Sequence, residues 1–150
     1  MPENVDTEAY IKVALFNYKC TCVQAIASDG FSVFLSTAGD VYTCGKGNFG
    51  RLGHGHEMNL HALTKINWFA SNGIRIKQIA AGGRHCLALS EQDNALYGWG
   101  FNYYHQLGKG HGDTEDKTCP QKLEVGLSYF DKIQSLACGY FNSAIIISYN

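Results

Sequence analysis

Short apolar runs separated by turn-forming residues recur along the whole chain. Leu87 and Leu89 alternate with the smaller Ala88, and in a strand this alternation places successive side chains on opposite faces. Turn signals such as Ser-Asp-Gly at 28–30 and Ala-Gly-Asp at 38–40 separate the runs. The pattern predicts strands at residues 10–16, 23–27, 31–36, 41–44, 62–66, 76–81, 86–90, 95–99, 121–125, 133–137 and 143–148. Residues 67–73 are expected to form a link with one helical turn, and 108–120 a long loop.

The apolar pattern is repeated. VYTCGKGNFGRLGHG (41–55) matches LYGWGFNYYHQLGKG (96–110) at an offset of 55 residues. Upstream, FSVFLS from Phe31 matches HCLALS from His85, and NSAIII from Asn142 is a partial third copy. A period of about 53–57 residues lies in the range of propeller blades.

Each full copy supplies three hairpin-connected strands and an outer strand, which is what a four-stranded blade needs. The sequence therefore predicts an all-β fold, a partial β-propeller of four-stranded antiparallel blades. We expect an N-terminal strand and lead-in at 1–22, a first repeat at 23–75, a second at 76–132 and a truncated third at 133–150. The chain thus holds about two and a half blades.

Composition and charge narrow the function classes. Hydrophobic residues make up 45% of the chain and charged residues 17%, with 17 glycines and two prolines, which suits short strands and tight turns. The net charge of −1 gives no electrostatic reason to expect nucleic acid or an anionic membrane as a partner. No apolar run approaches the ~20 residues of a membrane span, and the polar N-terminus does not read as a signal peptide. We expect an intracellular protein, cytoplasmic or nuclear, with its six cysteines as reduced thiols.

The second copy carries a recognisable motif. The pattern I-A-x-G-x-x-H-x-L-A-L, followed by L-Y-G-W-G-x-N-x-x-x-Q-L-G-x-G, resembles the repeat of the regulator of chromosome condensation family. The matching residues are Ile79, Ala80, Gly82, His85, Leu87, Ala88, Leu89, Tyr97, Trp99, Gly100, Asn102, Gln106, Leu107 and Gly108, with Ala137, Cys138 and Gly139 in the third copy. The resemblance implies blades of a seven-bladed propeller.

Some positions depart from the family pattern. Asn142 stands where the family has His, and the first copy replaces the family Trp, Asn and Gln with Cys44, Gly47 and Arg51. His105 takes a glycine position that Gly50 keeps. If the backbone there needs φ > 0, glycine accepts it freely and histidine is strained.

The motif residues are expected to be structural. Glycines permit tight turns, leucines fill the core, and a buried indole N–H needs a hydrogen-bond partner. This set comprises Gly45, Leu52, Gly53, His85, Trp99, Gly100, Leu107 and Gly108.

No pattern indicates catalysis, a metal or a cofactor. Cys20 and Cys22 lack a second pair at zinc-ligand spacing, and His54, His56 and His61 lie in a loop whose second copy has Lys109 in place of His54. The GKGNFG stretch lacks the spacing of a phosphate loop. We therefore predict no catalytic residue, no metal site and no cofactor.

The loops between strands are the candidate binding surface, because propellers carry function there. Aromatic residues and arginine are enriched at binding hot spots. The candidates are Asn48, Phe49, Arg51, Arg84, Phe101, Tyr103, Tyr104, His105, Tyr140 and Phe141. The alternative is that these aromatics pack against the next blade.

Two functions remain open. The first, which we favour, is a non-catalytic protein-interaction module, an adaptor or scaffold segment that binds a partner protein through these loops. The second, implied by the family resemblance, is guanine-nucleotide exchange on a Ran-type small GTPase with chromatin association. The arc of blades has open edges, so we expect a longer chain, self-association into a ring, or docking on another subunit.

Overall fold

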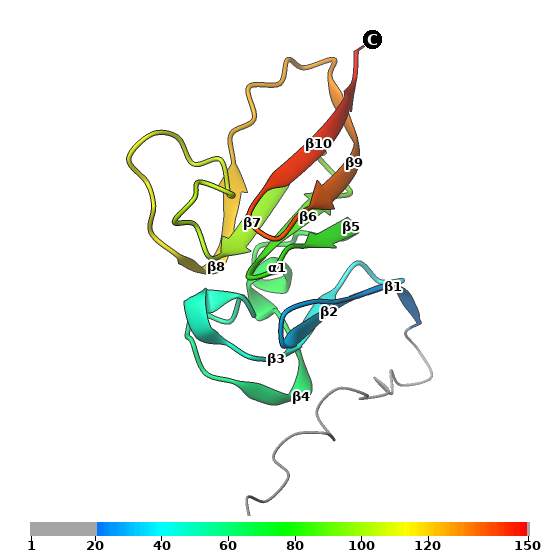
Figure 1. Ribbon diagram of the computed structural model, residues 1–150. Helices are drawn as coiled ribbons and strands as arrows, with labels where there is room; N and C mark the ends of the chain where they lie inside the picture. The colour runs from blue at the N-terminus through cyan, green and yellow to red at the C-terminus, as the bar shows by residue number, and fades with distance from the viewer. Residues whose placement is uncertain (1–20, 150) are drawn as a thin grey trace, which may run out of the picture.

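The computed structural model describes residues 21–149, and the predicted strand at 10–16 lies outside them. Within that range the chain forms three antiparallel sheets that lie side by side (Figure 1). No helix in these residues is long and apolar enough to cross a membrane. The arrangement is that of a partial β-propeller.

The first sheet has the order β1-β2-β3-β4 and the second the order β5-β6-β7-β8. In the first, the strands are β1 (Cys22–Ala27), β2 (Phe31–Ser36), β3 (Val41–Gly45) and β4 (Leu60–Lys65). A short 3-10 turn, η1 (Asn48–Gly50), follows β3, and helix α1 (Asn67–Ser71) supplies the predicted helical turn. The second sheet contains β5 (Ile76–Ala81), β6 (His85–Ser90), β7 (Leu96–Gly100) and β8 (Lys117–Leu123). The third pairs β9 (Lys132–Cys138) with β10 (Ser143–Ser148).

The prediction for β8 was wrong by four residues at its start. The sequence pattern places Cys119 and Pro120 in the long loop, yet both lie in β8. Proline lacks a backbone donor and is tolerated at the edge of a sheet, where β8 lies. The loop after β7 therefore ends at Asp116.

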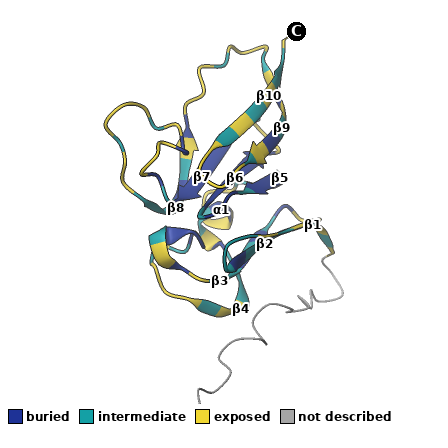
Figure 2. Cartoon of the chain, in the orientation of Figure 1, coloured by how far each residue is buried: buried dark blue, intermediate teal, exposed yellow. Residues whose placement is uncertain are grey.

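The central strands of the second sheet, β6 and β7, are buried on both faces because this sheet lies between the other two (Figure 2). Along β6, Cys86 and Ala88 belong to the apolar core shared with the first sheet, while Leu87 and Leu89 belong to the core shared with the third. The alternation seen in the sequence thus divides one strand between two cores.

Polar contacts join the innermost strands of neighbouring sheets. The side chain of Gln24 in β1 donates to the carbonyl of Ile79 in β5 (2.8 Å) and accepts from its N–H (3.0 Å). Ser28 Oγ donates to the carbonyl of Gly82 (2.6 Å), and the N–H of Gly83 donates to the carbonyl of Tyr140 (3.1 Å). These bonds fix each sheet on the next, and those of Ser28 and Gly83 lie in the turns at the end where the loops gather.

The backbone explains two of the repeat's glycine positions. Gly100 has φ 98°, and a Cβ there would lie 2.5 Å from the carbonyl oxygen of Arg84. The position shared by Gly50 and His105 has φ 71° and 60°, so it does need a positive φ, which glycine accepts freely and histidine adopts less often.

Candidate functional site

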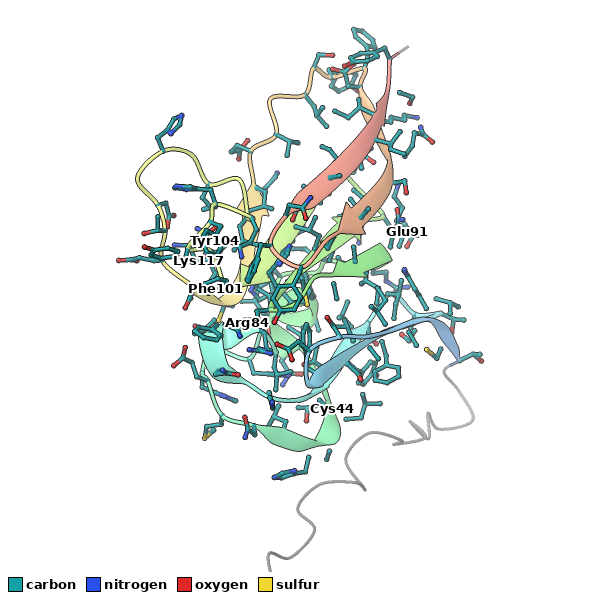
Figure 3. The ribbon with its side chains drawn as sticks, viewed as in Figure 1. Cys44, Arg84, Glu91, Phe101, Tyr104 and Lys117 are labelled. Carbon is teal, nitrogen blue, oxygen red and sulfur yellow. The ribbon has the colours of Figure 1, made fainter. Side chains whose placement is uncertain are left out.

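Loops from all three sheets bring aromatic side chains together at one end of the molecule. We call this surface the aromatic face. Arg84 comes from the turn between β5 and β6, and Figure 3 shows it beside Phe101 and Tyr104 from the loop after β7. Its members are Phe49, Arg84, Phe101, Tyr103, Tyr104, Tyr140 and Phe141.

The rings form a continuous series across the sheet boundaries. The centroid of Phe49 lies 4.9 Å from that of Phe101, at an interplanar angle of 60°. Phe101 is 6.4 Å from Phe141, which is 5.0 Å from Tyr104 and 4.5 Å from Tyr140. Edge-to-face pairs at these distances are favourable beyond the area they bury.

Arg84 and Asp29 fix the base of this cluster. The guanidinium carbon of Arg84 lies 5.0 Å from the Phe49 centroid and 6.0 Å from that of Phe101, within cation–π range. Its Nε is 3.6 Å from Asp29 Oδ2, which accepts a hydrogen bond from the Tyr140 hydroxyl at 2.8 Å. The Tyr140 bond, followed by the charges of Arg51 and Arg84, lowers the pKa of Asp29.

Several of these rings remain open to solvent although they contact one another. The exposed fractions are 62% for Tyr103, 57% for Tyr104, 48% for Tyr140 and 43% for Phe141. Phe49 and Phe101 are half-buried beneath them. Packing within the chain therefore accounts for only part of the aromatic surface.

Arg51 lies under this surface, where its side chain is 1% exposed. It donates to the carbonyls of Asn48 (3.0 Å) and Asp29 (2.6 Å) and stacks 5.6 Å from the Phe31 and Phe49 rings. It holds the loop in place and does not reach a partner from the outside. Asn48 and His105 are exposed at the edge of the face.

Asp29 is not among the residues predicted for this surface, because its Ser-Asp-Gly context indicates only a turn. The repeat register contains a signal that could have found it. Phe31, His85 and Asn142 are equivalent, since each carbonyl accepts from the N–H three residues earlier. Asp29 therefore occupies the position of Gly83 and Tyr140, and it meets Tyr140 in space.

Most of the motif residues lie in the interior, whereas Gly45 is half-buried and Gly108 is exposed. Leu52, His85, Trp99 and Leu107 are each at most 1% exposed. The Trp99 indole N–H donates to the carbonyl of Arg51 at 3.0 Å, so the predicted need for a partner is confirmed.

No cluster of metal-ligating side chains appears in the described part of the chain. Within residues 21–149, no group of three His, Cys, Asp or Glu side chains is placed to hold a metal ion. His54 contacts Thr43 Oγ1 at 2.7 Å and its ring lies 6.0 Å from that of His56. Burial, with a smaller contribution from His56, lowers the pKa of His54.

Comparison with known families matches two stretches, 38–89 and 93–146, to the regulator of chromosome condensation (RCC1) repeat. A second model with the same description matches 76–106. The first stretch starts ahead of β3 and ends in β6, and the second starts ahead of β7 and ends in β10. Each repeat unit thus begins in one sheet and ends in the next.

Known proteins share the repeat. The ultraviolet-B receptor UVR8 of Arabidopsis thaliana is 42% identical over 114 residues, covering 68% of this chain and 25% of the receptor. The human RCC1-like G exchanging factor-like protein is 34% identical over 124 residues, covering 83% of this chain and 26% of that protein. This chain therefore spans about a quarter of the length of these relatives.

A solved structure supports the same fold. Prp20p from Saccharomyces cerevisiae superposes with a TM-score of 0.78 over 90% of this chain and 33% of its own, at 23% identity. With the repeats matched in register and the sheets arranged as blades, the chain belongs to the RCC1 repeat family.

Proposed function

We propose that this chain is a non-catalytic protein-interaction module whose aromatic face binds a partner protein. The observation that carries the proposal is the contiguous, exposed series of Tyr103, Tyr104, Phe141 and Tyr140 over a half-buried base. A contiguous exposed apolar patch of this kind marks an interaction site. Tyrosine offers a large contact area with few rotatable bonds, so little conformational entropy is lost on binding.

The base of the face supports this role because it is already ordered. Phe49, Arg84 and Asp29 hold one another through ring, cation–π and ionic contacts. The charge of Arg84 is therefore partly neutralised within the chain, and binding would depend mainly on the tyrosine and phenylalanine rings. A pre-organised surface loses less entropy on association.

A double substitution tests the proposal. Tyr103→Ala with Tyr140→Ala should weaken binding at least ~10-fold, because losing even one aromatic hot spot costs about 1.4 kcal/mol or more. The partner is first identified by placing a photo-crosslinking phenylalanine at position 103, followed by mass spectrometry. Its affinity for each variant is then measured by titration calorimetry.

The matched control is Tyr129→Ala with Phe130→Ala. These two rings also contact each other edge-to-face, at 5.5 Å, and are 96% and 65% exposed, but they lie outside the aromatic face. We expect the control to change the affinity less than ~2-fold. Equal losses in both double variants, or no loss in the first, would contradict the proposal.

Guanine-nucleotide exchange is the second candidate function, and the name of the human relative at 34% identity favours it. Exchange factors act through protein contacts, so the aromatic face could serve as the GTPase contact. We expect this chain not to accelerate release of a fluorescent GDP analogue from a panel of small GTPases. A ~10-fold acceleration that Tyr103→Ala with Tyr140→Ala abolishes would establish exchange in place of the adaptor role.

A further inference from the structure

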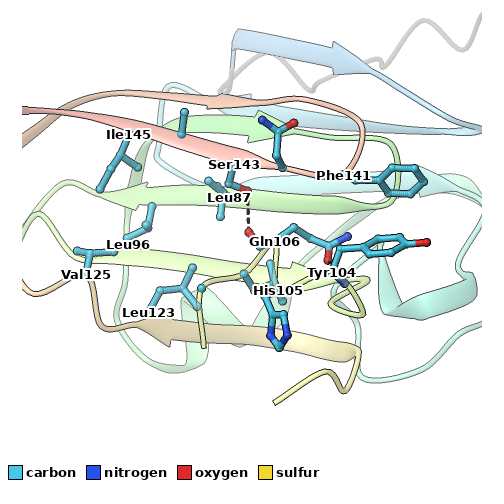
Figure 4. Close-up of a pocket in the computed structure, with 14 residues that line it drawn as sticks. Leu87, Leu96, Tyr104, His105, Gln106, Leu123, Val125, Phe141, Ser143 and Ile145 are labelled. Atoms are coloured by element: carbon cyan, nitrogen blue, oxygen red, sulfur yellow. Dashed lines mark hydrogen bonds between the residues drawn. The ribbon is translucent and has the colours of Figure 1, made fainter. Parts of the chain in front are cut away.

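Two pockets of different character lie between the second and third sheets. Beside β10, Leu87, Leu123 and Ile145 line an apolar pocket (Figure 4). The other pocket lies between β5 and β9, the adjacent inner strands of these two sheets (Figure 1), and has a volume of about 440 Å³. We call it the lysine pocket. Its polar lining consists of Lys77, Gln78, Asn94, Lys132 and Gln134.

The corresponding place between the first and second sheets is closed. There the carbonyl of Gly39, in the turn between β2 and β3, accepts a hydrogen bond from the N–H of Ile76 at 2.9 Å. A Cβ on Gly39 would lie 2.9 Å from the Cβ of Arg75, so this close approach needs glycine. Asn94 occupies the equivalent position, two residues before the third strand of its sheet, and its carbonyl receives no such bond from Ile133. The turn therefore stands off β9 and leaves the lysine pocket open.

The side-chain link between the inner strands is also missing at this interface. Gln24 of β1 bonds to both the carbonyl and the N–H of Ile79 in β5. Gln78 is its counterpart, since each glutamine pairs with the penultimate residue of the next strand, a leucine. Within residues 21–149 the Gln78 side chain makes no hydrogen bond. Its amide N–H groups are therefore available to a ligand in the pocket.

The pocket carries positive charge that is not balanced within it. No Asp or Glu of residues 21–149 lines it. Lys132 forms no ion pair with the described residues, and Lys77 Nζ contacts the side-chain oxygen of Asn94 at 3.5 Å. In the adjoining groove, Asp93 pairs with another lysine at 4.0 Å, and Asp131 accepts two hydrogen bonds from a serine in its own turn. The two lysines, one on each wall, are thus free to hold an anion.

We propose that the lysine pocket binds a small polyol that carries two or more phosphate groups. One phosphate lies on Lys77 of β5 and another on Lys132 of β9, and the amides of Gln78 and Asn94 donate hydrogen bonds to phosphate oxygens. Charge-assisted bonds of this kind are about twice as strong as neutral ones. Gln134 has its amide N–H₂ bonded within the third sheet, so its side-chain oxygen accepts from a polyol hydroxyl. A single phosphate ion would fill little of this volume, which lies in the range of small-molecule sites.

Titration calorimetry of the full chain with inositol 1,4,5-trisphosphate at low salt tests the proposal. The trisphosphate should bind saturably at one site, while myo-inositol, which lacks phosphates, should show no saturable binding at about 1 mM. Binding should weaken as salt is added, because the ligand is held by charge. The absence of saturable trisphosphate binding at the same concentration, or equal affinity for the two compounds, would overturn the proposal.

A matched pair of double variants locates the site. Lys77→Gln with Lys132→Gln removes both charges from the pocket and should weaken trisphosphate binding at least ~10-fold. Lys46→Gln with Lys109→Gln removes the same charge from loops outside the pocket and should change the affinity less than ~2-fold. Equal losses in the two double variants would mean that only net charge matters, and the lysine pocket would not be the site.

Asn94→Gly tests how the pocket is held open. The variant restores the residue found at Gly39, which lets the turn approach β9, and it removes one amide donor. We expect at least ~10-fold weaker binding, against less than ~2-fold for Asn72→Gly, which makes the same change outside the pocket. Unchanged affinity in Asn94→Gly would contradict the placement of the ligand.

The same phosphate chemistry is offered by a free solute and by a lipid head group. Sedimentation with phosphatidylcholine vesicles, with or without phosphatidylinositol 4,5-bisphosphate, separates these two sources. Sedimentation that needs the phosphoinositide and is competed by the trisphosphate identifies a head group in this pocket, and binding of the soluble compound alone identifies a free solute. Vesicle binding that survives Lys77→Gln with Lys132→Gln would overturn the proposal, because the contact would then lie elsewhere. Residues of the aromatic face do not line the lysine pocket, so Tyr103→Ala with Tyr140→Ala should leave trisphosphate binding unchanged and the two proposals fail independently.

Discussion

Replacing Trp99 with alanine is expected to lower the free energy of unfolding by about 4 kcal/mol, in the range for buried Phe or Trp truncated to alanine. The indole is 0% exposed, contacts the Phe69 ring at 5.8 Å and lies against Gly53. Its removal leaves a cavity in the core between the first and second sheets. The Arg51 carbonyl also loses the hydrogen bond that it accepts from the indole N–H. Denaturant unfolding followed by circular dichroism measures the change.

Trp68→Ala is the matched control for that variant. Trp68 is half-buried on α1 and packs on Phe69 and Tyr97 from the outside. We expect it to cost about 1–2 kcal/mol, because it is only partly removed from water. Equal losses of unfolding free energy in Trp99→Ala and Trp68→Ala would contradict the placement of Trp99 at the centre of the core between the first two sheets.

Hydrogen exchange on Trp99→Ala should show faster exchange in β1–β4 than in β9–β10, since neighbouring units stabilise each other across the core that they share.

Lowering the pH from 7 to 4 is expected to remove about 3 kcal/mol of stability through His85 alone. Burial lowers the pKa of this imidazole to about 4, and the backbone of Asn142 partly offsets the effect. His85 Nε2 lies 2.9 Å from Ser143 Oγ, and the Ser143 hydroxyl donates its own hydrogen to the Gln106 carbonyl. His85 Nε2 must therefore carry the hydrogen in its bond to Ser143. The other ring nitrogen, Nδ1, is the buried basic atom that would take up a proton.

The sign follows from proton binding. Between pH 6.5 and 4 the unfolded chain protonates at this residue and the folded chain stays neutral, so the unfolded state binds more protons. Stability is therefore fully present above pH 6.5 and falls as the pH drops toward 4. Below the folded pKa both states are protonated and this contribution stops changing.

His85→Asn separates this effect from other acid-sensitive groups. The chain itself places asparagine at the equivalent position, Asn142. Asp29 and Asp93, whose pKa values are lowered, remain in both proteins, so their contributions cancel in the comparison. The variant should lose about 3 kcal/mol less than the parent between pH 7 and 4. Parallel losses in both proteins would show that His85 does not titrate as described.

The sequence predicted the sheets well because the repeat supplied the same information twice. Leu87 and Leu89 alternate with Ala88, and the structure divides β6 between two cores accordingly. The start of β8 was missed because Pro120 indicates a loop from local preference alone, whereas its tolerance depends on which strand is at the edge.

The candidate site could be predicted only in part. In an antiparallel blade the turn between the first two strands and the loop after the third strand lie at the same end, so the repeat was enough to group Phe101 with Phe141. The burial of Arg51 could not be read from its own loop, because one acceptor of its guanidinium is the Asp29 carbonyl from the turn before β2. Contacts between segments so far apart in the chain depend on tertiary packing.

The boundaries of the RCC1 units have a consequence for how such chains can lengthen. The unit at 38–89 contains Val41, Leu52 and Ile66 on one side of the first core and Ile79 and Ala88 on the other. The unit at 93–146 contains Leu96 and Leu107 on one side of the core between the second and third sheets, and Leu136 on the other side. Duplicating one unit therefore copies most of an interface together with the strands that flank it. A chain that grows in this way adds a blade and the packing that attaches it in a single step.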